Sequence, residues 1–546
     1  MTAVAELVEA WAKLDAELTA PGAPFEVVEE DVRGERMAVF ADRPRSLREI
    51  LTRSTGHDER AAVVIGDGTE LSFVDLEREV AAVAAGLAAR GVRHGDRVAI
   101  ASANNLGWLL SFWAATSLGA VVTAMNGWWT QLEVDHALGL TEPSLVLADT
   151  KRLPLYAGAG IPTVDIDRDL DSLAGSRDAP LPDVAIAEDD PAMLIFTSGT
   201  TGRPKAAVLS HRSLVAFVQL QSLIAARGMA QRGLAPTGPP PTALAVAPLF
   251  HVSGISGTIG GLLTGTTTVW PLGRFDAAHV IELTERHGIG AWRGTVTHVM
   301  RLLDDPAIET LDVEQIKQVG IGGSASSPLI IRRTEERFPH LKGTFASGYG
   351  STETGGLSTY ASNAMLSAAP ECVGPALPTV AVRTVDADGN DVPEGEDGDV
   401  VVRSPLLMTE YWRHPEGNAE VFLPGGWVRT GDVGRIEDGA LFLASRKRDL
   451  IIRGGENVYP FEIENRLEEH PDVVESAVIP REHPVLGQEV EAVVVLAGGS
   501  TLTADELRAW CARSLASYKV PAHLELRTEP LPRNASGKIV KHELRS

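Results

Sequence analysis

The sequence predicts an α/β protein with a large N-terminal domain and a small C-terminal domain. Short apolar runs alternate with amphipathic stretches from about residue 60 to about residue 345, as in β-sheets flanked by helices. Between about 380 and 445 the pattern changes to strand, tight turn and strand, which indicates a β-rich subdomain. The end of the chain reads helix, strand, strand and helix, which is typical of a compact α+β domain.

Local signals predict the first elements. The stretch "AAVVIGDG" (61–68) has the pattern of a short buried strand and a turn. Ser72 and Asp75 have the spacing of a capping box at the start of a helix, and "RGVRHGDRVAIASAN" (90–104) predicts a turn followed by a strand. One face of the helix between them is apolar and consists of Leu76, Val80, Val83 and Leu87.

Turn residues and charges mark the later segments. "APTGPPPTAL" (235–244) predicts an exposed Pro-rich loop. In "VRTVDADGNDVPEGEDGDVVVRS" (382–404) an Asp-Gly turn separates two strands. A basic run lies between two apolar strands in "GALFLASRKRDLIIRGGENVYP" (439–460), and we expect the domain boundary there. The predicted domains are therefore residues 1–447 and residues 448–546.

The net charge limits the class of ligand. The chain has 546 residues, with 49 Lys and Arg against 73 Asp and Glu, a formal charge of -24. Such a balance argues against a protein that binds nucleic acids or an anionic membrane surface, because binding to either requires a basic patch on the protein. An anionic ligand must instead be bound by a local site that overcomes the field of the whole protein.

Cysteine content and terminal sequence predict a cytoplasmic protein. Cys372 and Cys511 are too few for a disulfide framework or a cysteine zinc site, and they fit a reducing compartment. The N-terminal stretch "MTAVAELVEAWAKLDAEL" is acidic and amphipathic, so we expect no signal peptide. No uncharged apolar window reaches about twenty residues, so we expect no membrane span.

A loop rich in glycine and hydroxyl residues interrupts "IFTSGTTGRPKAAVLSH" (195–211). Glycines allow backbone N–H groups to face a bound anion, and Lys205 adds positive charge, which together describe a phosphate cradle. The spacing of Gly199, Gly202 and Lys205 differs from that of a P-loop NTPase. Taken alone, the loop also fits an ordinary solvated turn.

Four further segments carry polar residues on glycine-rich turns: "GYGSTETG" (348–355), "WVRTGDVG" (427–434), "SRKRDLIIRGGENVYP" (445–460) and "PLPRNASGKIVKHELR" (530–545). With these motifs in this order, the chain from about residue 45 to 546 resembles the adenylate-forming superfamily. That superfamily includes acyl-CoA synthetases, peptide-synthetase adenylation domains and firefly luciferase. The resemblance implies mixed β-sheets flanked by helices in the large domain and a mobile C-terminal domain.

The resemblance also implies a reaction and roles for its residues. The family joins a carboxylic acid to AMP from ATP and releases pyrophosphate. Glu353 matches the carboxylate that holds Mg²⁺, Thr352 the hydroxyl that contacts the α-phosphate, and Tyr349 the aromatic that stacks on adenine. The β- and γ-phosphates would be bound by Thr197, Ser198, Gly199, Thr200, Thr201, Gly202 and Lys205. Adenine and the acyl pocket would be lined by Gly322, Gly323 and Ser324.

Other matches come from the second half of the chain and from one histidine. Asp432 and Arg446 resemble the residues that bind the ribose. Lys538 matches the lysine that bridges the α-phosphate and the carboxylate during adenylation. His251 matches an aromatic position between the acyl pocket and the thiol entrance. Alternatives remain open for three residues: a solvated cation for Lys205, a packing role for Tyr349 and a buried structural histidine for His251.

In the synthetase branch the CoA thiol then attacks the acyl-adenylate, after the small domain has rotated about a hinge. The hinge position is Arg448, where relatives often carry Asp or Lys, and Ser445 stands where a Gly is common. After the rotation, Arg453, Gly454 and Gly455 would line the pantetheine tunnel.

The acid is the least determined part of the prediction. "HVSGISGTIGG" (251–261) contains no acidic residue, which disfavours an amino acid, because an unpaired buried ammonium is costly. The apolar, glycine-rich "GISGTIGGLL" (254–263) and "GTVTHVMRLL" (294–303) favour a medium- or long-chain fatty acid. Alternatives are an aryl or arylalkanoate acid, a ligase that loads a carrier protein, and a non-catalytic nucleotide or acyl-CoA sensor. A homodimer is a further option for the assembled state.

Overall fold

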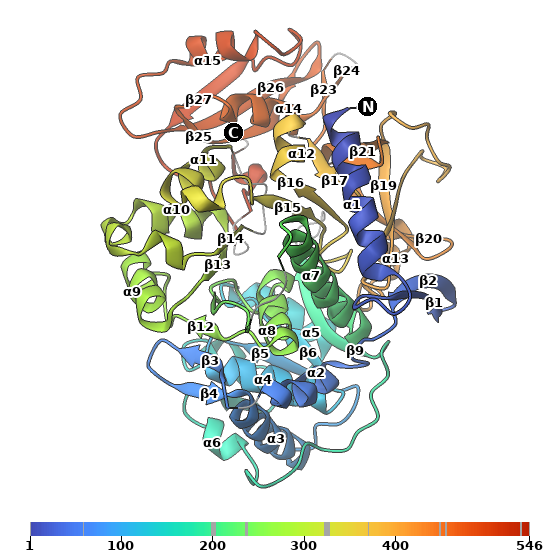
Figure 1. Ribbon diagram of the computed structural model, residues 1–546, viewed down its shortest axis with the longest axis vertical. Helices are drawn as coiled ribbons and strands as arrows, with labels where there is room; N and C mark the ends of the chain where they lie inside the picture. Colours follow the sequence, from blue (N-terminus) through green and yellow to red (C-terminus); the bar gives the residue numbers. More distant parts are fainter. Residues whose placement is uncertain are drawn as a thin grey trace.

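The computed structural model describes residues 2–57, 59–197, 204–234, 238–321, 328–369, 371–446, 449–453, 456–534 and 538–544. Figure 1 shows a large body of sheets and helices, with the C-terminal domain as a separate lobe at the top. The predicted α/β class, with a β-rich part and a small α+β domain, is confirmed.

One six-stranded sheet has the strand order β10-β9-β6-β5-β7-β8. Its strands are β5 (Arg97–Ala101), β6 (Val121–Ala124), β7 (Leu145–Ala148), β8 (Thr163–Asp165), β9 (Pro191–Thr197) and β10 (Lys205–Ser210). Neighbouring strands are parallel except β9 and β10, which form an antiparallel hairpin. Most of these strand residues are apolar and buried, as a parallel sheet covered on both faces requires.

A second six-stranded sheet has the order β14-β13-β11-β12-β3-β4. Its strands are β3 (Ala61–Ile65), β4 (Glu70–Ser72), β11 (Ala243–Leu244), β12 (Thr268–Trp270), β13 (Ala291–Gly294) and β14 (Gln318–Ile321). Strand β3 is the buried strand predicted for residues 61–68. The loop predicted for 235–244 was wrong at its last two residues, because Ala243 and Leu244 are buried and pair with β12 and β13.

Helices connect and cover these sheets. Helix α3 (Phe73–Ala89) contacts β3 and β4, and the almost wholly buried helix α4 (Leu106–Ser117) contacts α3, β5 and β6. Ser72 caps α3, because its Oγ accepts a hydrogen bond from the Asp75 backbone N–H at 3.0 Å. The second half of the predicted capping box does not form, because the Asp75 carboxylate accepts from the Ser72 hydroxyl at 2.8 Å and not from the Ser72 backbone N–H. The predicted apolar face of α3 is buried. Further helices are α2 (Leu47–Ser54), α5 (Gln131–Thr141), α6 (Leu170–Leu173), α8 (Val252–Thr264), α9 (Ala277–His287), α10 (Val296–Asp304) and α11 (Pro328–Arg337).

The long helix α7 (His211–Gln231) runs through the centre of the large body (Figure 1). It is the one helix in the described ranges that is long and apolar enough to cross a membrane. Its first ten residues are all buried against the protein core, which is how the central helix of a folded domain behaves. Helix α1 (Ala3–Thr19) packs against α7, where Asp15 pairs with the buried Arg227 at 2.8 Å.

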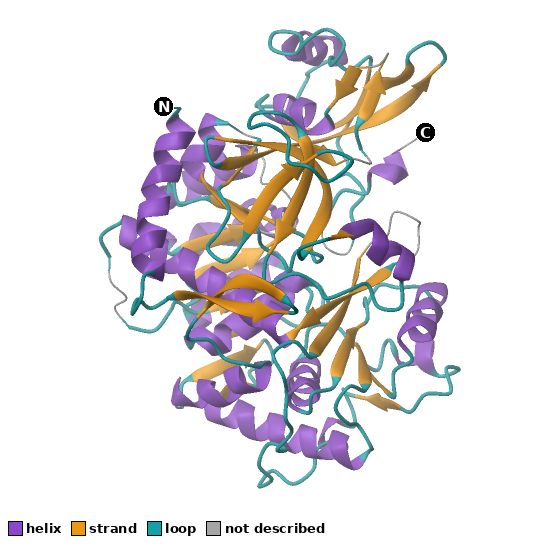
Figure 2. Ribbon diagram, turned by 90° about the vertical axis from the view of Figure 1, so that its right-hand side faces the viewer, coloured by secondary structure: helices purple, strands orange, loops and turns teal. Residues whose placement is uncertain are grey.

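The β-rich part forms a sheet with the order β17-β22-β21-β19-β18, and Figure 2 shows it in the middle of the molecule. Its strands are β17 (Cys372–Gly374), β18 (Ala381–Val385), β19 (Gly398–Arg403), β20 (Phe422–Leu423), β21 (Trp427–Glu437) and β22 (Ala440–Arg446). A separate hairpin pairs β15 (Ala346–Tyr349) with β16 (Thr359–Ser362), and β1 (Val27–Val32) pairs with β2 (Glu35–Phe40). Two short helices, α12 (Asn363–Ala368) and α13 (Pro415–Val421), complete this part.

The C-terminal lobe has its own sheet and its own apolar core. The strand order is β24-β23-β26-β25, with β27 added beside β26. The elements are β23 (Ile451–Arg453), β24 (Glu456–Val458), α14 (Pro460–Glu468), β25 (Val473–His483), β26 (Gly487–Leu496), α15 (Ala504–Cys511) and β27 (His523–Arg527). Buried side chains from these strands and both helices form one cluster, so the predicted helix, strand, strand and helix are all present.

The buried His211 makes the stability of the fold depend on pH. Its Nδ1 accepts a hydrogen bond from the Leu47 backbone N–H at 3.1 Å, and burial lowers the pKa of the imidazole to about 4. Between about pH 4 and 6.5 the unfolded chain therefore binds a proton that the folded chain does not, so stability falls as the pH decreases. At pH 5 this loss is about 2 kcal/mol, since each pH unit below the unfolded pKa contributes about 1.4 kcal/mol.

We expect the variant His211→Asn, which keeps a side-chain acceptor, to lose less stability than the original protein between pH 7 and pH 5. Urea unfolding at each pH measures the difference. The control His279→Asn makes the same replacement at a partly exposed histidine on α9 and reports how much the substitution itself changes stability at each pH. An unchanged pH slope in His211→Asn would contradict the assignment.

Candidate active site

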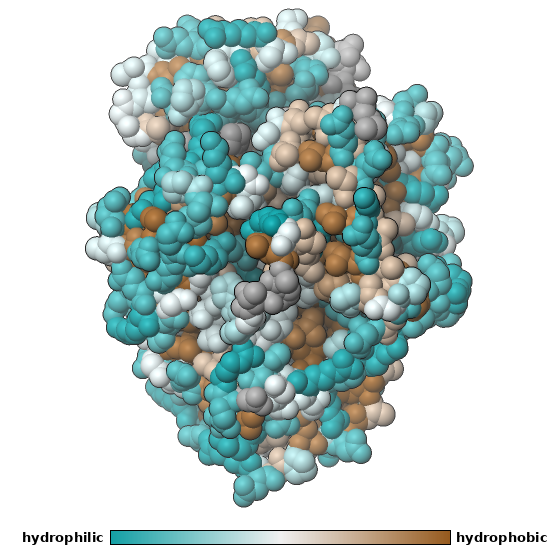
Figure 3. Space-filling model, viewed as in Figure 1, coloured by the Kyte–Doolittle hydropathy of each residue, from teal (hydrophilic) through white to brown (hydrophobic). Residues whose placement is uncertain are grey.

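A large cleft of about 3280 Å³ lies between the two domains. It is bounded by the end of β9, helices α7 and α8, strands β13 to β15, strand β21 and the last residues of the chain. On the face shown in Figure 3 the outer surface is largely hydrophilic, and apolar side chains gather in the central hollow. The cleft therefore combines apolar walls with polar groups from both domains, as small-molecule sites do.

A tight turn after β15 brings the residues of "GYGSTETG" into the cleft. Gly355 and Gly356 have positive φ angles of 72° and 103°, and a Cβ atom on Gly355 would lie 2.1 Å from the Leu406 carbonyl oxygen. Only glycine fits this turn without strain. As a result, Thr352 and Glu353 both line the cleft.

Tyr349 and Asp432 meet across two different sheets. Tyr349 ends β15, Asp432 lies on β21, and the tyrosine hydroxyl donates a hydrogen bond to Asp432 Oδ2 at 2.6 Å. Asp432 is buried and its backbone is paired with that of Arg446 on β22. The structure thus joins three residues that the sequence motifs place far apart, although it does not describe the side chain of Arg446.

Glu353 lies in a polar group that also contains two residues of the predicted phosphate loop. Thr197 ends β9 and Lys205 begins β10, and their backbones are paired in the hairpin. Lys205 is buried and its Nζ lies 3.8 Å from Glu420 Oε2. Between these residues and Glu353 lies Tyr411, which the sequence reasoning missed because no local signal distinguishes it from a core aromatic.

Lys538 reaches the cleft from the C-terminal lobe. Its backbone N–H donates to Asn534 Oδ1 at 3.0 Å, and the Asn534 N–H donates to the Lys538 carbonyl at 2.9 Å. An ion pair between Arg533 and Glu475 anchors the same segment to β25. These contacts tie the backbone of Lys538 to Asn534, and the neighbouring Arg533 to β25.

His251 faces the positive charge of Lys538. It precedes α8, stacks at a tilt on Phe250 with ring centroids 4.6 Å apart, and lines the cleft. Burial and then the nearby Lys538 ammonium lower the pKa of His251 to about 4, so its ring is neutral at ordinary pH. Its buried Nε2 has no hydrogen-bond partner among the described residues.

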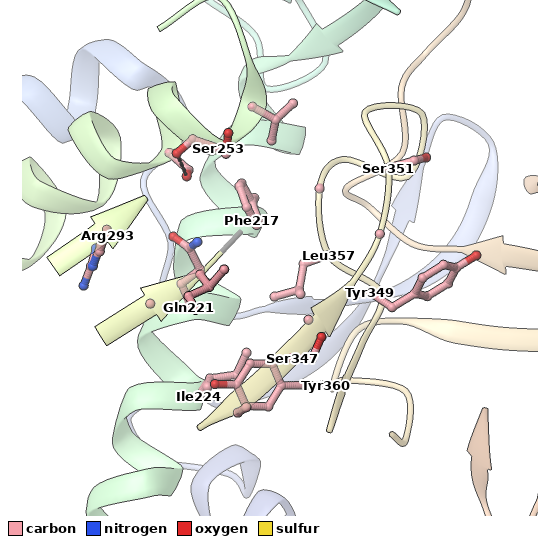
Figure 4. Close-up of a pocket in the computed structure, with 18 of the residues that line it drawn as sticks. Phe217, Gln221, Ile224, Ser253, Arg293, Ser347, Tyr349, Ser351, Leu357 and Tyr360 are labelled. Atoms are coloured by element: carbon pink, nitrogen blue, oxygen red, sulfur yellow. Dashed lines mark hydrogen bonds between the residues drawn. The ribbon is translucent and has the colours of Figure 1, made fainter. Parts of the chain in front are cut away.

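One part of the cleft lies between α7 and the β15–β16 hairpin (Figure 4). Phe217, Gln221 and Ile224 project from successive turns of α7, opposite Leu357 and Tyr360. The carboxamide of Gln221 has no hydrogen-bond partner within the described part of the chain. The wall is therefore apolar with a few exposed polar groups, which include the hydroxyls of Ser347 and Tyr360.

Some predicted site residues lie elsewhere or are not described. Arg453 is not at the cleft, since its guanidinium pairs with Glu489 at 3.7 Å in the C-terminal lobe. The predictions for Ser198, Gly199, Thr200, Thr201, Gly202, Gly322, Gly323, Ser324, Arg448, Gly454 and Gly455 lie outside the described residues.

The donor set fits a magnesium ion that is bound together with phosphates. No group of three His, Cys, Asp or Glu side chains that could hold a metal alone occurs in the ranges that the structure describes. Magnesium usually takes only one or two carboxylates from the protein and completes its shell with water and phosphate oxygens. Glu353 Oε2 has no hydrogen-bond partner among the described residues and can serve as such a ligand.

A large cleft between an α/β domain and a small lobe, with converging carboxylates, hydroxyls and a lysine, is typical of the active site of a two-domain enzyme. Residues 51–412 match the AMP-binding enzyme family and residues 462–538 match the AMP-binding enzyme C-terminal domain. The chain belongs to the AMP-binding enzyme family and is an AMP-forming acid–thiol ligase.

Individual relatives agree with this class. The chain is 34% identical over 496 residues to a feruloyl-CoA synthase of Amycolatopsis sp, covering 89% of this chain and 95% of the relative. It is 31% identical to a fatty acid–[acyl-carrier-protein] ligase of Streptomyces coeruleorubidus, covering 90% and 94%. The o-succinylbenzoate coenzyme A synthetase of Bacillus subtilis, solved with ATP and a magnesium ion, is 28% identical with a TM-score of 0.76, covering 91% and 98%.

Proposed function

We propose that this ligase is an acyl-CoA synthetase, which forms an acyl-adenylate from ATP and a carboxylic acid and then transfers the acyl group to CoA. The observation that carries the proposal is the convergence of two domains on one cleft. Lys538 comes from the C-terminal lobe, while Tyr349, Glu353 and Asp432 come from the large domain. Cations and donors from both domains can then stabilise charge that develops at a single phosphorus atom.

In the proposed adenylation step the large domain binds the nucleotide. Asp432 would accept hydrogen bonds from the ribose hydroxyls, because a carboxylate can accept several O–H donors. The hydrogen bond from the Tyr349 hydroxyl fixes the orientation of both side chains, and the Tyr349 ring would stack on adenine. Arg446, whose backbone lies opposite Asp432, would assist at the ribose.

The phosphates would be bound at the β9–β10 end of the cleft. Thr197 and Lys205 supply a hydroxyl and a cation there, and Thr352 would contact the α-phosphate. Glu353 would hold Mg²⁺, which when bound neutralises phosphate charge and polarises the phosphoryl oxygens. Lys538 would bridge the α-phosphate and the incoming carboxylate as negative charge accumulates there.

Thioester formation requires a second arrangement of the lobe. With Lys538 in the cleft, Arg453 is held away from it by Glu489, so both cannot act at the same moment. We propose that rotation near Arg448 withdraws Lys538 and brings Arg453, Gly454 and Gly455 to the pantetheine path. His251 would then lie between the acyl group and the entering thiol. The predicted domains, 1–447 and 448–546, are the two bodies of this rotation.

The acyl pocket supports an aromatic acid with a polar ring substituent better than a plain alkyl chain. The carboxamide of Gln221 and the hydroxyls of Ser347 and Tyr360 face the pocket, and an alkyl chain would bury them without partners. Burial of unpaired polar groups is costly, whereas a ring hydroxyl would satisfy them. The medium- or long-chain fatty acid favoured by the sequence is the rival substrate.

The substitution Gln221→Leu separates these two substrates. We expect it to lower kcat/KM for a ring-hydroxylated arylalkenoic acid by about tenfold to a hundredfold, because one hydrogen-bonding partner is lost. The unhydroxylated acid of the same size should change by less than about threefold. Pyrophosphate release over a panel of acids measures both. An equal change for both acids, or a preference of the original protein for alkyl acids, would contradict an aromatic substrate.

The same panel tests the proposed function as a whole. Pyrophosphate release should require an acid and Mg²⁺, and acyl transfer should require a thiol. Comparison of free CoA with a phosphopantetheinylated carrier protein separates the CoA ligase from the carrier-loading alternative. We further propose a reducing, cytoplasmic location, which the two buried free cysteines support.

A further inference from the structure

One buried side chain in the cleft has no role in the function proposed above. Tyr411 lies in the segment that follows β19, and this segment adds to the edge of the first sheet beside β10. The backbone N–H groups of Thr409 and Trp412 donate to the carbonyls of Val208 and Ala206 at 2.9 and 2.8 Å. The Tyr411 backbone is therefore held beside the strand that begins with Lys205.

The side chain of Tyr411 contacts three residues of the phosphate end of the cleft. Its hydroxyl donates to Glu353 Oε1 at 2.8 Å and is hydrogen-bonded by the side chain of Thr197. The Lys205 ammonium lies over its ring, with Nζ 5.0 Å from the ring centroid. One phenol thus touches the proposed metal carboxylate and both the first and the last residue of the predicted phosphate loop.

Two further contacts make this position rigid. The Tyr411 backbone N–H donates to Asn418 Oδ1 at 2.6 Å, and Asn418 Nδ2 donates to the Tyr411 carbonyl at 3.0 Å. Behind Glu353, the Met408 N–H donates to the Glu353 carbonyl at 3.0 Å. Both the donor and the acceptor of the Tyr411–Glu353 hydrogen bond are therefore fixed by their backbones.

The chemistry of the phenol suits a permanent donor. A phenol has a single O–H, with an ordinary pKa of about 10, and in the structure Tyr411 donates it to Glu353 Oε1. The bond occupies Glu353 Oε1 and leaves Oε2 for another partner. Groups that hold a metal ligand in this way commonly change metal affinity by ten- to a hundredfold when removed.

We propose that Tyr411 is a positioning residue that orients the Glu353 carboxylate for Mg²⁺ and holds Lys205 beside the phosphates. The proposal rests on the proposed role of Glu353. It assigns two separable tasks to one side chain: the hydroxyl acts on the metal carboxylate, and the ring acts on the lysine.

The test measures metal binding directly, without turnover. Mn²⁺ is titrated into the full-length protein with the nonreactive analogue α,β-methylene-ATP, and free Mn²⁺ is read by electron paramagnetic resonance. Tyr411→Phe removes the hydroxyl and keeps the ring, so we expect the Kd for Mn²⁺ to rise about tenfold. Binding of the metal-free analogue in EDTA and the melting temperature should remain unchanged. Tyr411→Leu also removes the ring and should weaken metal-free analogue binding as well.

The controls separate this proposal from the proposed function. Tyr156→Phe alters another buried tyrosine, which does not line the cleft, and should change neither measurement. If Glu353→Gln weakens Mn²⁺ binding while Tyr411→Phe does not, the positioning role is overturned and the metal role of Glu353 stands. If Glu353→Gln has no effect, both fail. An equal loss of metal-free and metal-dependent binding in Tyr411→Phe, with a lower melting temperature, would show a purely structural tyrosine.

Discussion

Replacement of Lys538 with alanine is expected to slow adenylation by on the order of a hundredfold or more. Formation of the thioester from supplied acyl-AMP and CoA should remain largely intact. The two half-reactions are measured separately, by pyrophosphate release from ATP and the acid and by consumption of synthetic acyl-AMP. The size of the effect reflects the loss of a cation aimed at the phosphoryl group as charge accumulates.

The position of Lys538 explains why only adenylation should be affected. Lys538 lies in the cleft together with Glu353 and Asp432, close enough to His251 to lower the pKa of its imidazole. It belongs to the lobe, however, and must leave the cleft if the lobe rotates for the second step. A residue that is present in only one arrangement can affect only the reaction of that arrangement.

A matched control removes a lysine from the same lobe but outside the cleft. Lys519 pairs with Glu462 at 2.7 Å, and Lys519→Ala should leave both half-reactions close to their original rates. Equal loss of both half-reactions in Lys538→Ala would contradict the two-arrangement scheme, and an unaffected adenylation rate would remove the assignment of Lys538.

Substitution of proline at the predicted hinge should produce the opposite pattern. We expect Arg448→Pro to preserve adenylation and to slow thioester formation by on the order of a hundredfold, because proline fixes φ at the pivot. Residues 447 and 448 lie between the last strand of the β-rich sheet, which ends at Arg446, and the first strand of the lobe, which begins at Ile451. Few backbone torsions are available there to rotate one domain against the other.

Adenylation and thioester formation are again measured separately, and the control variant is Arg448→Ala. Alanine removes the guanidinium but leaves φ free, so Arg448→Ala should retain both reactions if the backbone is what matters. Should the proline variant lose neither reaction, the pivot lies elsewhere in the linker. Should alanine impair thioester formation as much as proline, the side chain and not the torsion is responsible.

Local patterns in the sequence were sufficient for many elements of the fold. The cap at Ser72 and the buried face of α3 depend on residues three or four positions apart, so their contacts can be inferred from spacing. The alternation of strands and helices, and the later change to a β-rich pattern, could likewise be inferred from the sequence. The sequence did not predict strand β11 (Ala243–Leu244), because two residues are too few to show the alternation of apolar and polar residues that marks a strand.

By itself the sequence determined the class of chemistry, because its ordered motifs match those of the AMP-binding enzymes. The same motifs predict a nucleotide site, a metal carboxylate and a terminal lysine, residue types that suit the charges of ATP and Mg²⁺. Only the tertiary structure decided which neighbours serve those groups. The Tyr411 hydroxyl meets Glu353 across 58 residues of chain, and α1 covers α7 through a pair separated by 212 residues. Such contacts depend on how sheets and helices pack together, and no local spacing encodes them.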